Sequence, residues 1–155
     1  MKVSSVFHPA VACLGPDATL TAAASLMHAG RFGSVAIYEG DRLVGILTET
    51  DVVRAVAEHR RPETATIAEF MSRDPVTAGL DEDSVEVAER MVRGGYRHLP
   101  VLDSDRLVGI VSARDLLQVE AWPPATRRDN LLPAVDHPVR PRRGHLVEPE
   151  PTRDS

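Results

Sequence analysis

The hexapeptide DRLVGI occupies positions 41–46 of the chain and returns unchanged at positions 105–110, 64 residues later. A repeat at a fixed period decides the architecture of a chain before any single residue does. Two copies predict a pair of similar folding units, and function is sought where equivalent residues of the two copies meet. The same offset aligns Val3, Val6, Phe7, Gly15, Met27 and Asp51 with Ile67, Phe70, Met71, Gly79, Met91 and Asp115.

Each copy has the pattern of a β-α-β-β-α unit. In the second copy, acidic residues precede an apolar stripe that is typical of a helix, and Gly94-Gly95 end it. Two β-rich runs, 98–102 and 107–111, follow with a polar turn between them, and a second helix begins near Ala113. We therefore predict an α+β fold with two repeats related by a pseudo-two-fold, their sheets packed together with flanking helices.

The predicted boundaries follow from the repeat and from composition. The first repeat spans 1–59 and the second spans 66–120, with a polar connection between them. The remainder, 121–155, is rich in proline and has no apolar period, which predicts a mostly disordered tail. A single repeat buries too little surface to be stable alone, so the two are expected to pair.

Composition limits the classes of function. The net charge of −5 argues against a nucleic-acid surface, which needs a basic face. The single cysteine, Cys13, excludes an internal disulfide framework and fits a reducing compartment. No apolar run reaches the ~20 residues of a membrane helix, and the first residues do not resemble a secretory signal. The chain is expected to be cytoplasmic, without membrane insertion.

Both copies carry the pattern Gly-x-x-Ser/Thr-x-x-Asp, at 45–51 and at 109–115. A hydroxyl followed three residues later by an acid is first a helix-capping arrangement. A second interpretation is a ligand site, because a helix N-terminus attracts phosphate and a carboxylate can accept both hydroxyls of a ribose. In that interpretation, the glycine lets a ligand approach the backbone closely.

With these motifs the sequence resembles the cystathionine-β-synthase-type (CBS) domain pair, or Bateman module. The resemblance covers about residues 3–120 and includes Leu99-Pro100-Val101 and the paired Leu-Val-Gly-Ile segments. It implies a stand-alone regulatory module without catalysis, which senses an adenosine-containing ligand in clefts between the copies. AMP, ADP, ATP and S-adenosylmethionine are the implied ligands, and no cofactor is required. The implied partners are a second copy, forming a homodimer, and an unknown regulated enzyme or transporter.

The resemblance also implies roles for residues that match the motifs. Asp51 and Asp115 would hold the ribose, with Thr48 and Ser112 near the phosphate. The basic residues before Leu-Pro-Val would contact phosphate, and a threonine would lie beside the adenine. The resulting candidate residues are Ser112, Asp115, Arg114, Arg97, His98, Thr77, Thr48 and Asp51.

The first copy departs from this pattern. Gly33-Ser34 stands where Arg97-His98 stands in the second copy, and Cys13 replaces Thr77. Glu49 adds a negative charge inside the first motif. A phosphate is therefore expected to prefer the site that carries Ser112 and Asp115.

Several alternatives stay open from sequence alone. The motif carboxylates can serve only as caps, His98 can be an ordinary hydrogen-bonded histidine, and Arg97 and Arg114 can be surface charges or partners of acidic neighbours. The histidines show no metal-ligand spacing, and no nucleophile elbow, Walker loop or GxGxxG motif predicts catalysis. The rival to the ligand sensor is a ligand-free module for dimerisation or protein interaction.

Overall fold

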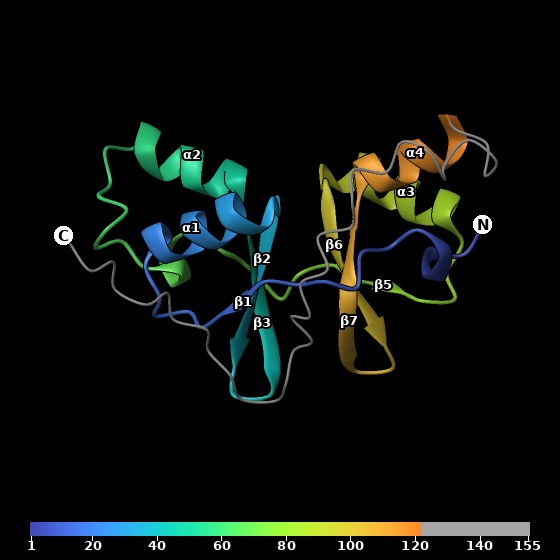
Figure 1. Cartoon of the computed structure of the whole chain (residues 1–155), viewed down its shortest axis with the longest axis horizontal. Coiled ribbons are helices and arrows are strands. Elements are labelled where there is room, and N and C mark those ends of the chain that lie inside the picture. The colour runs from blue at the N-terminus through green and yellow to red at the C-terminus, as the bar shows by residue number, and fades with distance from the viewer. Residues whose placement is uncertain (122–155) are drawn as a thin grey trace. The chain divides into compact units, whose positions relative to one another are not determined.

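The structure is a computed structural model that describes residues 1–121. The predicted disordered tail lies outside the described residues, apart from residue 121. The described residues form two compact units. One unit consists of Met1–Val11 together with residues 75–121, and the other is Ala12–Asp74. Figure 1 shows both units, each with a small sheet and two helices.

The unit Ala12–Asp74 contains the first repeat. Its elements are β1 (Cys13–Leu14), α1 (Leu20–Gly30), β2 (Ser34–Glu39), β3 (Arg42–Thr48), α2 (Glu49–Ala57), the 3-10 helix η2 (Ile67–Glu69) and β4 (Ser72–Arg73). The strands form one sheet in the order β1-β2-β3-β4. The first pair is parallel and the other two pairs are antiparallel. The core of this unit lies between the sheet and its helices.

The other unit contains the second repeat. Its elements are the 3-10 helix η1 (Val3–Ser5), β5 (Ala78–Gly79), α3 (Ser84–Gly94), β6 (His98–Asp103), β7 (Arg106–Ser112) and α4 (Ala113–Ala121). The sheet order is β5-β6-β7, with β5 and β6 parallel and β6 and β7 antiparallel. Both units therefore have the β-α-β-β-α order, and the predicted α+β class is confirmed.

Helix starts follow the expected capping chemistry. The side chain of Thr19 accepts a hydrogen bond from the amide of Ala22 at the start of α1, and Asp83 accepts one from Val85 at the start of α3. The ends differ between the repeats. Gly95 adopts the left-handed conformation after α3, whereas Arg31, a residue with a Cβ, adopts it after α1. α1 therefore ends at Gly30, and the left-handed position is the next residue.

The chain segment that precedes each repeat packs in the core of the other repeat. Val3 of η1 is fully buried in the unit that holds the second repeat, and Ile67 of η2 is fully buried in the unit that holds the first. Full burial of such a side chain contributes about 1.5–3 kcal/mol. The compact units therefore do not coincide with the two runs of the sequence repeat.

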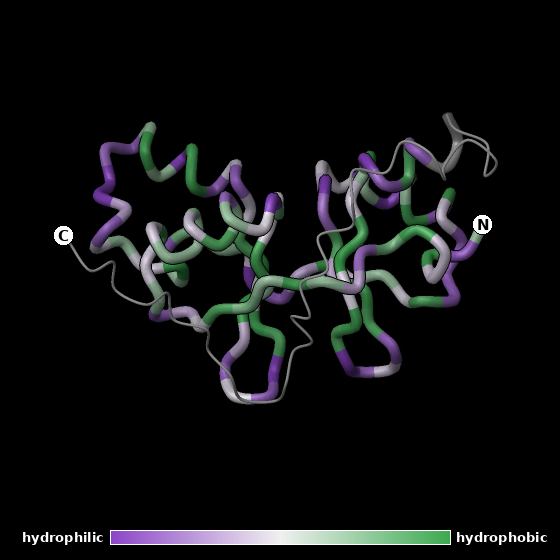
Figure 2. Tube along the Cα trace, viewed as in Figure 1, coloured by the Kyte–Doolittle hydropathy of each residue, from purple (hydrophilic) through white to green (hydrophobic). Residues whose placement is uncertain are grey.

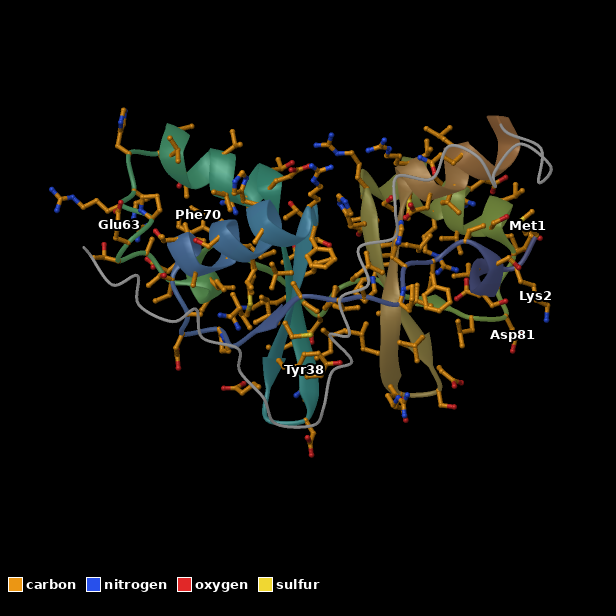
Figure 3. All side chains as sticks on the ribbon, viewed as in Figure 1. Met1, Lys2, Tyr38, Glu63, Phe70 and Asp81 are labelled. Atoms are coloured by element: carbon orange, nitrogen blue, oxygen red, sulfur yellow. The ribbon has the colours of Figure 1, made fainter. Side chains whose placement is uncertain are left out.

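Backbone pairing repeats this exchange at equivalent positions. Lys2 forms an isolated β-bridge with Asp83, and its equivalent Thr66 forms one with Thr19. The segment Met1–Val11, which precedes the first repeat but packs in the unit of the second, is called the exchanged segment below. It also carries the exposed ion pair of Lys2 with Asp81, 2.9 Å, and Figure 3 shows these two side chains close together. In each unit the strands are mostly hydrophobic and the hairpin turns are hydrophilic (Figure 2).

Candidate functional site

The candidate site lies at the end of the β5-β6-β7 sheet where α4 begins. His98, the first residue of β6, pairs with Ser112, the last residue of β7. Because β5 runs parallel to β6 with Ala78 opposite Val101, Thr77 precedes β5 at this same end. The register thus brings the second-repeat candidates to one end of one sheet.

Ser112 and Asp115 form a tight capping arrangement at the start of α4. One carboxylate oxygen of Asp115, Oδ2, accepts from the amide of Ser112 at 2.7 Å and from its hydroxyl at 2.6 Å. The hydroxyl of Ser112 in turn accepts from the amide of Asp115 at 3.2 Å. The capping interpretation of the motif is therefore correct for the second copy, and it occupies only one of the two carboxylate oxygens.

The other oxygen of Asp115 contacts a histidine from the exchanged segment. Nε2 of His8 lies 3.0 Å from Oδ1 of Asp115. The Asp115 side chain is 10% exposed and that of His8 is 70% exposed. The hydrogen bond to Asp115 raises the pKa of His8, against the opposing effect of burial. Burial acts to raise the pKa of Asp115, but hydrogen bonds from His8 and Ser112 hold that pKa below its ordinary value.

The glycine of the motif has a different role from the one predicted. A Cβ on Gly109 would overlap the carbonyl oxygen of His8 and the ring of Phe7. In the first repeat, a Cβ on Gly45 would lie 2.7 Å from Sδ of Met71 and 2.9 Å from the carbonyl oxygen of Ser72. The prediction that this glycine admits a ligand is wrong, because in each repeat the crossing segment that precedes the other repeat fills the space over the glycine.

The remaining second-repeat candidates lie around Ser112. The carbonyl oxygen of Arg97 accepts a hydrogen bond from the amide of Ala113, 2.9 Å, which ties the start of β6 to the first residue of α4. The side chains of Arg97 and Arg114 are exposed, and His98 is half-buried. The ion pair that the structure shows at Asp115 is with His8. Two cationic side chains and one histidine therefore lie close in sequence or register to the α4 N-terminus.

Thr77 lies beside a second network. Its carbonyl oxygen accepts from Nη1 of Arg90 at 2.7 Å, and Arg90 is also paired with Glu82. Thr77 is one of the residues that line a shallow open hollow, which extends along β5 toward Asp81 and Ser104. This hollow includes neither Ser112 nor Asp115. Within this unit, Thr77 thus shares a sheet end with the motif but also borders a separate surface depression.

The first-repeat motif has the same cap with a different neighbour. Oδ2 of Asp51 accepts from the amide of Thr48 at 2.9 Å and from its hydroxyl at 3.2 Å. The ion pair at Oδ1 is with Arg54, one turn later on α2, at 3.5 Å. Ser72 is the repeat equivalent of His8, which lies 64 positions earlier in the sequence and belongs to the other unit. The two motifs are therefore alike in their caps and unlike in what faces the second oxygen.

Cys13 is a partly buried thiol on β1. Burial raises its pKa to about 11, and burial together with the charge of Cys13 raises the pKa of Tyr38 to about 12. A thiol with such a pKa is a poor nucleophile near neutral pH. Cys13 therefore has the properties of a small packing residue rather than of a reactive thiol.

Residues 1–121 contain neither a group of metal ligands nor a membrane-spanning helix. No three His, Cys, Asp or Glu side chains in this range are grouped so that they could hold a metal ion. None of the helices described is long and apolar enough to cross a bilayer.

Sequence reasoning missed His8. The repeat alignment placed Phe7 on Met71, and its next step pairs His8 with Ser72. A titratable histidine in one copy, aligned with a serine in the other, is a sequence signal that the two copies differ chemically at this position. What the sequence could not supply is that this segment packs in the unit of the second repeat, against Asp115.

Comparisons with known proteins agree with the repeat and the fold. The sequence pattern of the CBS domain matches residues 3–58 and 67–121. An uncharacterized 17.7 kDa protein of Acidianus ambivalens is 33% identical over 117 residues, which cover 74% of this chain and 70% of the relative. The uncharacterized protein MK0525 of Methanopyrus kandleri is 34% identical over 119 residues, covering 75% of this chain but only 61% of the relative.

A solved structure extends the similarity to a ligand complex. The CBS domain pair of protein MJ0100, solved with 5-methylthioadenosine and S-adenosyl-L-methionine, superposes with a TM-score of 0.71 at 28% identity. The match covers 78% of this chain and 96% of that one. The chain belongs to the CBS-domain family, and its two CBS domains form a pair, which is a regulatory module.

Proposed function

We propose that this CBS pair senses an adenosine-containing ligand, one of AMP, ADP, ATP or S-adenosylmethionine, at the α4 N-terminus. The observation that carries the proposal is the arrangement of Ser112 and Asp115 beside Arg97 and His98. Oδ1 of Asp115, which lies outside the helix cap and contacts His8, can accept ribose hydroxyls in place of that contact, while the cationic side chains and the helix N-terminus favour phosphate. The adenosine ligands of the similar MJ0100 pair support the same class of ligand.

Charge favours the second-repeat site over the first for a phosphate. Gly33, Ser34 and Thr50 stand where the second repeat has Arg97, His98 and Arg114. At the first site, Glu49 adds a negative charge next to the capping Thr48. We therefore place the stronger site at Asp115 and the weaker one at Asp51.

Calorimetry tests this proposal. Nucleotide-stripped protein is titrated with AMP, ADP, ATP and S-adenosylmethionine, and binding of at least one is expected. Ser112→Ala combined with Asp115→Ala should abolish that binding. Thr48→Ala with Asp51→Ala is the matched control, since it removes the same kind of helix cap and should retain the stronger site. Absence of heat and of a thermal shift with all four ligands would refute the proposal.

We further propose that the pair acts as a homodimer in the cytoplasm and passes the ligand signal to a regulated enzyme or transporter. Large apolar side chains are exposed on the helices: Val53 is 66% exposed on α2, and its repeat equivalent Leu117 is 67% exposed on α4. Exposed apolar patches mark interaction surfaces. A ligand can bias such an assembly only through different affinities for its arrangements.

The same exposed side chains, one in each unit, favour the second candidate function, a ligand-free interaction module. Light scattering on Val53→Glu and Leu117→Glu tests the oligomer, with Thr21→Glu on the exposed face of α1 as the charge control. Loss of dimer in either of the first two variants is expected. Dimerisation with no ligand binding in the wild type would favour the interaction module.

A further inference from the structure

The two oxygens of Asp115 have separate tasks. Oδ2 is used by the cap of α4, where it accepts from both the amide and the hydroxyl of Ser112. Oδ1 faces Nε2 of His8 at 3.0 Å. If Asp115 receives a ribose hydroxyl, as the proposed function requires, Oδ1 is the oxygen that is not committed to the helix. A ligand hydroxyl and His8 then compete for the same atom.

The backbone fixes the position of His8. Its amide donates to the carbonyl oxygen of Ile110 at 2.8 Å, and its carbonyl oxygen accepts from the amide of Ile110 at 3.0 Å. Gly109 allows the segment to cross at this close distance. These contacts involve only main-chain atoms of His8, so another side chain can be placed there without moving the segment.

The first repeat lacks this competitor. Ser72 forms the equivalent bridge to β3, opposite Ile46. Oδ1 of Asp51 is paired instead with Arg54, at 3.5 Å. Arg54 corresponds to Gln118 in the second repeat. The titratable contact to the motif carboxylate is therefore a property of the second repeat.

We propose that His8 is a pH-dependent competitor for Oδ1 of Asp115. The imidazolium form holds Oδ1 against a ligand hydroxyl, and the neutral imidazole yields it. This inference rests on the proposed function, because it concerns the same carboxylate. It makes His8 a residue that sets the affinity of the site and couples that affinity to proton concentration.

The sign of the coupling follows from linkage. A ligand that displaces His8 removes the contact that favours its charged form, so binding releases a proton at pH values between the ordinary pKa of the displaced imidazole and the raised pKa of the paired one. Affinity then rises with pH, from the ordinary imidazole pKa of about 6.5 up to the raised pKa of the paired His8. If the displaced His8 instead contacted a ligand phosphate, affinity would fall as the pH rose.

Other charged groups lie at this end of the sheet and can affect the charge of His8 or of the ligand. Asp115 and Arg114 come from α4, and Arg97 and His98 come from the start of β6. His98 is a second histidine at this end of the sheet, so each measurement is repeated in a His98→Gln background.

Adenosine is the probe, because it has the ribose diol and no phosphate that titrates. By calorimetry, wild-type affinity for adenosine is expected to be on the order of twofold weaker at about pH 5.5 than at about pH 8, because the contact that the ligand displaces involves a largely exposed histidine. His8→Ser, which places the first-repeat residue at this position, should bind equally at both pH values. His28→Gln, an exposed histidine on α1, should retain the wild-type dependence.

A second measurement separates the failure of this inference from that of the proposed function. The pKa of His8, followed by NMR, should fall toward its ordinary value in Asp115→Asn, and also in wild type when adenosine is bound. Binding that is independent of pH, or stronger at low pH, would overturn the competition alone. Binding by wild type but not by His8→Ser would also overturn the competition alone. If neither wild type nor His8→Ser binds adenosine or any of the four proposed ligands at either pH, the proposed function fails, and the competition fails with it.

Discussion

Gly109 lies directly under the backbone of His8, so close that any Cβ at Gly109 would overlap the carbonyl oxygen of His8. The two residues are about a hundred positions apart in sequence and belong to one compact unit. The close approach explains why the repeated hexapeptide contains a glycine. It also explains how His8 comes near enough to α4 to contact Asp115.

Gly109→Ala should destabilise the protein by about 1–3 kcal/mol, the usual cost of forcing atoms into a packed region. The obstacle is backbone, which cannot rotate away. Gly79→Ala is the control, because its Cβ would meet Glu82 only at an ordinary 3.4 Å. Chemical denaturation of both variants measures the difference. Equal stability of Gly109→Ala and wild type would contradict the crossing of the segment over this glycine.

Ile67→Ala should destabilise the unit that contains the first repeat, by about 2–5 kcal/mol for a buried isoleucine. Ile67 is fully buried there, although it precedes the second repeat in sequence. Hydrogen exchange should show lost protection in β2 and β3. Val3→Ala should instead reduce protection in β6 and β7, and Val92→Ala, with its side chain 83% exposed, should change neither. Loss of protection in the repeat that follows each segment would contradict the exchange.

The ion pair of His8 with Asp115 should stabilise the fold within a limited pH range. Because the pKa of His8 is raised, its contribution is fully present below the unfolded-state pKa of about 6.5 and is lost as the pH rises through the raised pKa. The pKa of Asp115 is lowered, so the contribution is also lost as the pH falls through that value. The effect should be a few tenths of a kcal/mol, since His8 is largely exposed.

Denaturant midpoints of wild type and His8→Gln, compared at about pH 6 and about pH 9, measure this contribution on either side of the titration. His8→Gln should be less stable than wild type at the lower pH and equal to it at the higher. His28→Gln should match wild type at both. A constant difference at the two pH values would show that the charge of His8 is not involved.

Cys13 should react slowly with thiol reagents in the folded protein. Its pKa of about 11 leaves little thiolate at neutral pH, and its side chain is only partly accessible. The rate of modification, followed spectrophotometrically, should increase strongly when the protein is unfolded in denaturant. A free small thiol at the same pH serves as the reference. Modification of the native protein at the rate of that reference would be inconsistent with the burial of Cys13.

The order of strands and helices could be predicted from sequence because it depends on local patterns. The capping acids, the apolar stripes and the polar hairpin turns each predict their own element, and the repeat provides a second test of each assignment. The Ser112 and Asp115 cap could be predicted for the same reason, since its two residues are three positions apart.

The exchange of segments could not be predicted in this way. Val3 and Ile67 look alike in sequence, and an apolar residue before a repeat does not indicate which core receives it. The role of Gly109 was misassigned as a consequence, because a glycine that admits a ligand and a glycine that admits a crossing chain have the same sequence pattern. The partner of Asp115 required knowledge of that crossing.

The reciprocal placement of η1 and η2 bears on the origin of such a chain. A polypeptide with a single repeat would have a leading segment with no core to enter and a core with an open position. Each could be completed only by another molecule of the same kind. Joining two such molecules end to end would turn an exchange between chains into one within a chain. The two crossings are equivalent in position but not in chemistry, with His8 at one and Ser72 at the other.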